Sequence, residues 1–217
     1  MADRTIVVVS AGIGTPSSTR LLADRLGSAV ELRLRSVGLA PATTTLELRD
    51  LAHELTDNLL TGFPVPALRG AIDAVVAADG LIAVSPIFSA SYNGLFKMFF
   101  DVLDRDGLAE KPVLIAATGG SPRHSLALEH AFRPLFAYLD AAVVPTAVYA
   151  ATEDWGGADD PIVGALVDRI ERAAAEMARA VAAEERSVPL DPFADPTPFE
   201  DLLTGSPSTS SASRETR

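Results

Sequence analysis

The sequence of 217 residues contains no cysteine, and its only lysines are Lys97 and Lys111. The absence of cysteine excludes disulfides, a thiol nucleophile and thiolate metal sites. No apolar run approaches the roughly 20 residues needed to span a bilayer. The first residues, MADRTIVVVS, lead into a strand pattern and show no signal-peptide pattern. We therefore expect a soluble, cytoplasmic protein with no membrane association.

A basic stripe is also missing. The formal net charge is −11 and the pI is about 4.6, whereas a nucleic-acid-binding protein presents clustered lysine and arginine. We therefore expect no nucleic-acid partner. The histidines, His53, His124 and His130, are not spaced as metal ligands, and we expect no metal site.

What the sequence does contain is an alternation of strand-like and helix-like segments. Apolar and β-branched runs predict strands over residues 5–10, 30–37, 80–86, 111–120 and 141–150. Helical patterns cover residues 16–29, 46–60, 66–78, 93–105, 125–139 and 160–185. This alternation predicts an α/β fold in which helices cover both faces of a five-stranded parallel sheet of order 2-1-3-4-5. We assign residues 1–186 to this domain and residues 187–217, rich in proline, serine and threonine, to a flexible tail.

Ligands of such sheets bind beyond the carboxyl ends of the strands, and the first strand ends in SAGIGTPSSTR, residues 10–20. Gly12 and Gly14 begin a dinucleotide fingerprint, but Ser17 stands where the third glycine belongs. The predicted second strand ends in LRLRSVG, without the acidic residue that holds a ribose, and the loop lacks the lysine of a P-loop. Hydroxyls beside the free N–H groups of a helix N-terminus favour a terminal monophosphate. The alternative is an ordinary helix cap at Ser17 or Ser18.

Two further strand ends carry features that suit a flat ligand. The segment SPIFSASYNGLFKMFFD (85–101) offers Phe88 and Tyr92 to flank a planar ring. The segment ATGGSPRHS (117–125) offers Gly119 and Gly120, which let backbone approach a ligand closely. Each feature alone also fits a turn, a core residue or a hinge. Together, at one edge of one sheet, they predict a ligand site.

These segments resemble the NADPH-dependent FMN reductase family of flavodoxin-like proteins, over residues 5 to about 185. The similarity is greatest to the actinobacterial FMN reductases found beside luciferase-like monooxygenases. SPIFSASYNGLFKMFFD and ATGG carry most of it. Many relatives have an arginine in the first loop, where this sequence has Ile13 and Gly14. The resemblance implies a flavodoxin-like three-layer sandwich that binds FMN and uses NAD(P)H.

The resemblance also implies which residues hold FMN. The donors to its ribityl phosphate would be Ser10, Ser17, Ser18 and Thr19. The residues around the isoalloxazine ring and ribityl chain would be Pro86, Ile87, Phe88, Ser89, Asn93 and Gly94. The residues at the pyrimidine edge of the ring would be Thr118, Gly119 and Gly120. No catalytic side chain is expected, because the flavin supplies the chemistry. Arg123 is a candidate for a nicotinamide nucleotide phosphate, or else a solvated loop residue.

Three functions remain open from the sequence. The first is an NAD(P)H-dependent FMN reductase that supplies reduced flavin to a monooxygenase. The second is a reductase that retains its flavin and reduces quinones or another acceptor. The third is a flavodoxin-like electron carrier that is not an enzyme. The segment 93–105 is too apolar for one buried stripe, so we also expect a homodimer or a dimer of dimers.

Overall fold

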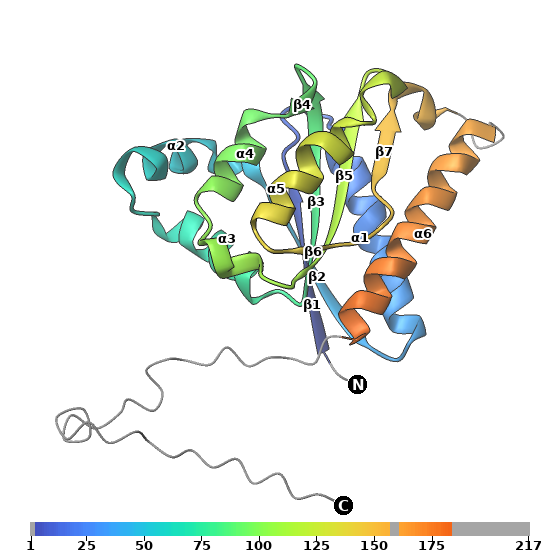
Figure 1. The fold of residues 1–217 in the computed structure, drawn as a ribbon, viewed down its shortest axis with the longest axis horizontal. Coiled ribbons are helices and arrows are strands. Elements are labelled where there is room, and N and C mark those ends of the chain that lie inside the picture. The colour runs from blue at the N-terminus through green and yellow to red at the C-terminus, as the bar shows by residue number, and fades with distance from the viewer. Residues whose placement is uncertain (1–2, 157–160, 184–217) are drawn as a thin grey trace, which may run out of the picture. The chain divides into compact units, whose positions relative to one another are not determined.

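A parallel β-sheet lies between two layers of helices in the computed structural model, which describes residues 3–156 and 161–183 (Figure 1). The sheet path runs β2-β1-β3-β5-β6, while β7 also pairs with β5, and the short β4 pairs antiparallel with β3. The strands are β1 (Asp3–Ser10), β2 (Ala40–Glu47), β3 (Gly80–Phe88), β4 (Ser91–Tyr92), β5 (Pro112–Gly119), β6 (Ala142–Val143) and β7 (Val148–Ala151). The predicted order 2-1-3-4-5 is confirmed, with the last strand in two pieces.

The helices follow the expected alternation. The α-helices are α1 (Ser18–Ser36), α2 (Ala52–Thr61), α3 (Pro66–Ala77), α4 (Gly94–Asp101), α5 (Arg133–Tyr138) and α6 (Pro161–Ala183). Shorter helical turns are η1 (Leu48–Leu51), η2 (Arg105–Leu108), η3 (Pro122–His124), the π-helical η4 (Leu128–Phe132) and η5 (Thr152–Trp155). Helices α1 and α6 cover one face of the sheet, and α3, α4 and α5 cover the other (Figure 1).

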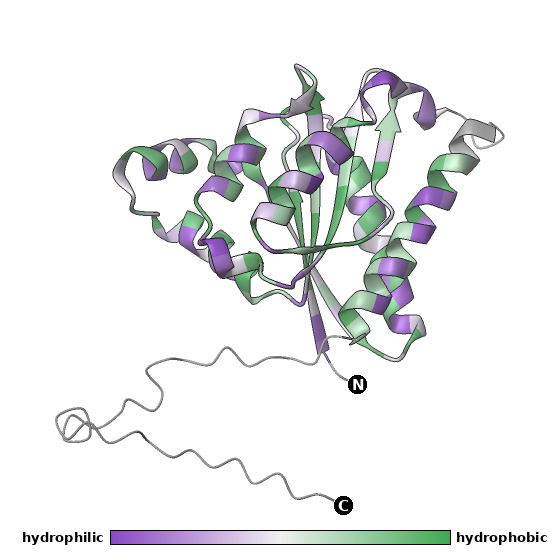
Figure 2. Cartoon of the chain, viewed as in Figure 1, coloured by the Kyte–Doolittle hydropathy of each residue, from purple (hydrophilic) through white to green (hydrophobic). Residues whose placement is uncertain are grey.

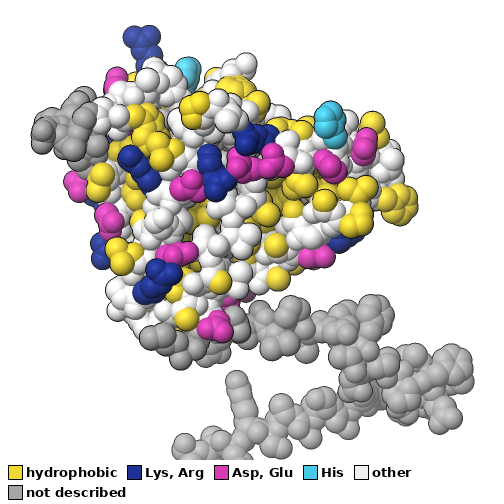
Figure 3. Space-filling view, turned by 180° about the vertical axis from the view of Figure 1, so that it is seen from behind, with side chains coloured by type: hydrophobic (Ala, Val, Ile, Leu, Met, Phe, Trp, Pro, Cys, Tyr) yellow, Lys and Arg dark blue, Asp and Glu magenta, His cyan; other side chains and the backbone are white. Residues whose placement is uncertain are grey.

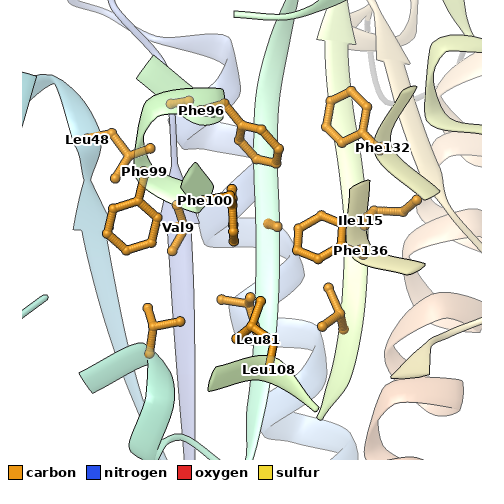
Figure 4. Close-up of a cluster of buried hydrophobic side chains, with 14 of the residues drawn as sticks. Val9, Leu48, Leu81, Phe96, Phe99, Phe100, Leu108, Ile115, Phe132 and Phe136 are labelled. Carbon is orange, nitrogen blue, oxygen red and sulfur yellow. The ribbon is translucent and has the colours of Figure 1, made fainter. Parts of the chain in front are cut away.

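The strands divide their side chains between two hydrophobic cores, one on each face of the sheet. In β1, Val7 and Val9 face the helices α3, α4 and α5, whereas Ile6 and Val8 face α1 and α6. This period of two is the pleat of a β-strand, and burial on both faces explains the continuous apolar runs that marked the strands (Figure 2). Rings from α4, η4 and α5 fill the first core (Figure 4).

The predicted second strand, residues 30–37, is wrong. These residues continue α1, and the true second strand is β2. Leu22, Leu26, Val30 and Leu34 recur every four residues and are all fully buried, so the apparent alternation is one stripe of a long helix. Strand β2 has the sequence APATTTLE and no fully buried residue. An edge strand with a proline and few apolar residues shows little of the hydrophobic pattern by which strands are predicted.

Other predicted boundaries of helices and strands also differ from the observed ones. The predicted helix 46–60 begins later, at η1 and α2, because Glu47 still belongs to β2. Helix 93–105 shortens to α4, and helix 125–139 divides into η4 and α5. The predicted strand 141–150 is divided into β6 and β7, with Pro145 between them. The tail 187–217 and the domain boundary at residue 186 lie outside the described residues.

No single helix in residues 3–156 and 161–183 is long and apolar enough to cross a membrane. One pair of helical segments, Leu48–Thr61 and Pro66–Ala77, has the length and apolar composition of a membrane span only when the two segments are counted together, and they are bent by 92°.

Candidate functional site

The carboxyl ends of β1, β3 and β5 lie side by side at one edge of the sheet, at the top of Figure 1. Ser10 pairs in register with Val84, and Pro86 pairs with Thr118. The loops that follow these strands are therefore neighbours, although they lie far apart in the sequence. We call residues 11–17 the first loop, residues 86–93 the second loop and residues 119–124 the third loop.

Two side-chain clamps hold the loops together. The hydroxyls of Thr19, at the start of α1, and Thr118, at the end of β5, share a hydrogen bond of 2.8 Å. Asn93 donates from Nδ2 to the Ala11 carbonyl at 2.6 Å, while its Oδ1 accepts from the Phe96 amide at 2.9 Å and caps α4. Thr19, Thr118 and Asn93 are all buried. Buried polar groups with satisfied hydrogen bonds fix a geometry, because breaking one leaves its partner unpaired.

The first loop folds tightly against the start of α1. Ser17 is the helix cap, and its Oγ accepts from the Arg20 amide at 3.1 Å. A Cβ on Gly12 would collide with that same Oγ, so glycine is needed there for the close approach. The peptide bond between Thr15 and Pro16 is cis. The capping alternative for Ser17 is therefore observed, and the Ser17 hydroxyl proton remains available to a ligand.

The second loop is a small hairpin. Ile87 pairs with Tyr92, and Phe88 pairs with Ser91. Between them Ser89 and Ala90 both have positive φ, of 50° and 69°, as in the two-residue turns that connect tight hairpins. The Phe88 side chain is 51% exposed.

Tyr92 lies on the core side of the second loop. Its ring centroid is 5.4 Å from those of Phe96 and Phe132. Of the two aromatic residues expected to flank a ring, only Phe88 stands out into solvent.

The third loop rests on Tyr149, a residue of β7 that the sequence did not single out. Its Oη donates to the Ser121 carbonyl at 2.7 Å, and a Cβ on Gly119 would collide with the ring and its hydroxyl. Burial, and secondly the charge of Asp154, raise the pKa of Tyr149, so the hydroxyl stays protonated as a donor. A Cβ on Gly120 would meet nothing within 4 Å. Gly119 therefore serves packing within the chain, whereas Gly120 faces open space.

A charged cluster lies beside the first loop. Glu47, the last residue of β2, pairs in register with Ser10 and forms an ion pair of 2.5 Å with Arg20. The expectation that the second strand ends without an acidic residue is thus wrong, because it was based on the wrong strand. The Arg49 guanidinium, from η1, contacts Glu47 at 3.3 Å and donates to the Thr15 hydroxyl at 2.5 Å.

The sequence model of the NADPH-dependent FMN reductases matches residues 4–156. The chain belongs to this family. A curated FMN reductase (NADPH) of Pseudomonas aeruginosa is 36% identical over 172 residues, covering 78% of this chain and 90% of that protein. The NADH-dependent FMN reductase SfnF of Pseudomonas fluorescens is 38% identical over 174 residues, covering 80% and 89%. An oxidoreductase structure from Corynebacterium diphtheriae superposes with a TM-score of 0.82 at 46% identity, covering 85% of this chain and 100% of that one.

Family membership confirms the resemblance and makes the chain an oxidoreductase that uses FMN and NAD(P)H. The relatives include both NADPH-dependent and NADH-dependent enzymes, at similar identity to the chain.

The first loop fits the phosphate of FMN. The backbone amides of residues 12–15 and 17–19 donate to no acceptor within the described part of the chain. Pro16, which lies between these two ranges, has no N–H. Unpaired amides at a helix N-terminus are a ready anion site. Ser18 is exposed there, and Ser17 is half-buried. Ser10 differs: it is fully buried, and its hydroxyl has no partner among the described residues.

The remaining predicted residues line the other two loops at different depths. Those exposed to solvent are Phe88, Ser89, Gly94 and Gly120; those half-buried are Pro86, Ile87 and Gly119. Arg123 and His124 are exposed on η3, at the outer end of the third loop. The predicted site is thus a shallow surface formed by backbone and hydroxyl groups, with the Thr19, Asn93 and Thr118 clamps beneath it.

Two hollows lie outside the first and second loops. One of about 600 Å³ lies between α1 and α6, and one of about 460 Å³ lies behind the third loop, against Tyr149 and Arg169. The residues lining them include none from the first or second loop.

Proposed function

We propose that the chain transfers hydride from NAD(P)H to FMN and releases reduced FMN as a product. The observation that carries this proposal is the loop arrangement. Unpaired amides lie on the first loop, and the open Gly120 lies on the third loop, at the same sheet edge. The isoalloxazine ring, when bound, accepts hydride at its N5 atom.

The chain's own residues then have positioning roles. The amides of the first loop and the Ser17 and Ser18 hydroxyls would hold the phosphate. The Asn93 clamp fixes the first loop against the second, and Gly120 leaves room for the ring edge. No histidine or carboxylate is needed to move a proton at N5, and His124 is exposed on the rim of the site.

An assay of the purified chain tests the proposal. NADH and NADPH oxidation are measured with and without added FMN, together with the visible spectrum of the protein. We expect little bound flavin and steady oxidation only when FMN is added, saturating with FMN. Steady turnover by a permanently yellow protein without added FMN would instead support a flavin-retaining acceptor reductase. Bound FMN without any oxidation of either nicotinamide would support an electron carrier.

We further propose that the reduced FMN is consumed by a flavin-dependent monooxygenase in the cytoplasm. The similarity to reductases found beside luciferase-like monooxygenases supports this partner, and NAD(P)H and FMN are cytoplasmic cofactors. Coupling is tested by adding a candidate monooxygenase to the reductase, NADH and FMN. Product formation that stops when the reductase is omitted is the expected result.

A homodimer or a dimer of dimers is also proposed. Leu95 and Met98 of α4 and Val102, which follows it, are only half-buried in the single chain. Hydrophobic side chains also gather over α2, which contacts α4, and α3, on the right of Figure 3. Leu60 in α2 is 81% exposed, and Phe63, in the link between α2 and α3, is 80% exposed. Light scattering at micromolar concentration is expected to give a multiple of the 22.7 kDa chain mass; a monomer mass would contradict the proposal.

A further inference from the structure

The first loop supplies amides and hydroxyls but no charge. Residues 11–17, AGIGTPS, contain no lysine, arginine or histidine. The FMN phosphate carries close to two negative charges at neutral pH. Amides and hydroxyls can hold a phosphate at a helix N-terminus, but they leave part of this charge uncompensated, so a cation from another element would strengthen binding.

Arg49 lies where such a cation is needed. Its Nη1 donates to the Thr15 hydroxyl at 2.5 Å and to the Gly14 carbonyl at 3.3 Å, so the guanidinium lies against the outer half of the first loop. Its Nε is near the carboxylates of Glu47 and Asp50, at 3.3 and 3.5 Å. Its Nη2 has no hydrogen-bond partner among the described residues. The orientation of the group is thus fixed on two sides, and two N–H donors remain available on the third.

Arg20 is the other cation near the loop, and its guanidinium is directed to two carboxylates. Its Nε donates to Asp24 at 2.8 Å and its Nη1 to Glu47 at 2.5 Å. These carboxylates raise the pKa of Arg20, the Asp24 hydrogen bond most of all. Asp50 beside Arg49 is 70% exposed, so water screens its opposing charge. Arg20, like Arg49, has an Nη2 without a hydrogen-bond partner among the described residues. Only the Arg49 guanidinium, however, donates to the first loop itself, so Arg49 is the cation better placed to reach a phosphate there.

We propose that Arg49 determines specificity for the flavin 5′-phosphate: its free guanidinium edge binds the FMN phosphate and makes the site prefer FMN over riboflavin. This inference rests on the proposed function. A planar guanidinium presents paired donors that match phosphate oxygens. Arg49 thus supplies from η1 the positive charge that the first loop lacks.

The test is a pair of binding titrations on the purified chain. Flavin fluorescence quenching gives the dissociation constants of FMN and of riboflavin for the wild type, Arg49→Gln, Arg49→Lys and the control Arg35→Gln. Arg35 also forms a carboxylate pair on α1, with Glu31, but lies at the far end of the helix. Circular dichroism and thermal melting establish that each variant is folded.

We expect Arg49→Gln to weaken FMN binding about tenfold to a hundredfold, as for loss of a hydrogen bond to a charged group. Riboflavin binding should stay within about twofold, since riboflavin carries no phosphate. Arg49→Lys should recover part of the loss, and Arg35→Gln should match the wild type. An equal loss for both flavins would show that Arg49 only orders the loop, and unchanged FMN binding would show no role; either overturns the inference. A wild type that binds both flavins equally overturns it while leaving the reductase proposal intact. A wild type that binds neither overturns both.

Discussion

Gly119 and Gly120 are adjacent, yet the structure predicts opposite responses to substitution. In Gly119→Ala the new Cβ would lie 3.0 Å from Cζ of Tyr149 and closer still to its hydroxyl. Overpacking of this kind costs about 1–3 kcal/mol. Displacing the Tyr149 hydroxyl from the Ser121 carbonyl adds about 1 kcal/mol. We expect a loss of about 2–4 kcal/mol in the free energy of unfolding. Gly120→Ala meets no atom within 4 Å and should change stability by less than about 0.5 kcal/mol.

Urea unfolding of both alanine variants, and of Gly119→Ala combined with Tyr149→Phe, measures these effects. Removing the hydroxyl takes away the worst collision, so the double variant should recover about 1 kcal/mol or more relative to additivity. Equal costs at the two glycines, or strict additivity of Gly119→Ala and Tyr149→Phe, would refute the packing argument.

The same position separates stability from ligand binding. Gly120→Val should fold as well as the wild type but bind FMN at least about tenfold more weakly, because its side chain occupies the space open to the ring edge. Titration with FMN measures this loss. Unchanged FMN affinity in folded Gly120→Val would remove the third loop from the flavin site.

Much of the fold could be predicted because parallel strands buried on both faces are apolar throughout. The runs in β1, β3 and β5 are therefore visible in the sequence. Strand β2 was missed for the opposite reason: it lies at the sheet edge and is half-exposed along its whole length. Hydrophobic periodicity cannot identify a strand that buries so few side chains. The alternating pattern in residues 30–37, which was assigned to the second strand, belongs instead to the end of α1.

The loops of the site could be predicted because they follow strands that could be predicted. Tyr149 and Arg49 could not, since each reaches its loop from an element far along the chain. Arg49 follows the strand that was misplaced, so its position beside the first loop was hidden by the same error. The burial of Ser10 could not be predicted from its residue type either. The last residue of a central strand is covered by neighbouring segments, and only the fold shows which segments these are.

Four further experiments probe the site. Asn93→Ala should lower the free energy of unfolding by about 2–4 kcal/mol in urea, since it removes a helix cap and leaves the buried Ala11 carbonyl unpaired; a loss below about 1 kcal/mol would contradict the clamp. Ser18→Asp should weaken FMN binding more than about tenfold by charge repulsion, without loss of stability, because an acidic group suits a helix N-terminus; unchanged affinity in a titration would contradict the phosphate assignment. Because the folded chain raises the Tyr149 pKa, the unfolded chain loses that proton first, and stability should fall as the pH rises above about 10. Tyr149→Phe should flatten that part of the pH profile, and an unchanged slope would refute the assignment. His124→Ala should keep its turnover at saturating NADPH and FMN, with at most a raised apparent KM for NADPH, because hydride transfer to a flavin requires stacking and distance rather than a side-chain acid. Loss of turnover in this variant, with FMN binding intact, would demonstrate a catalytic acid at the rim and require a different mechanism.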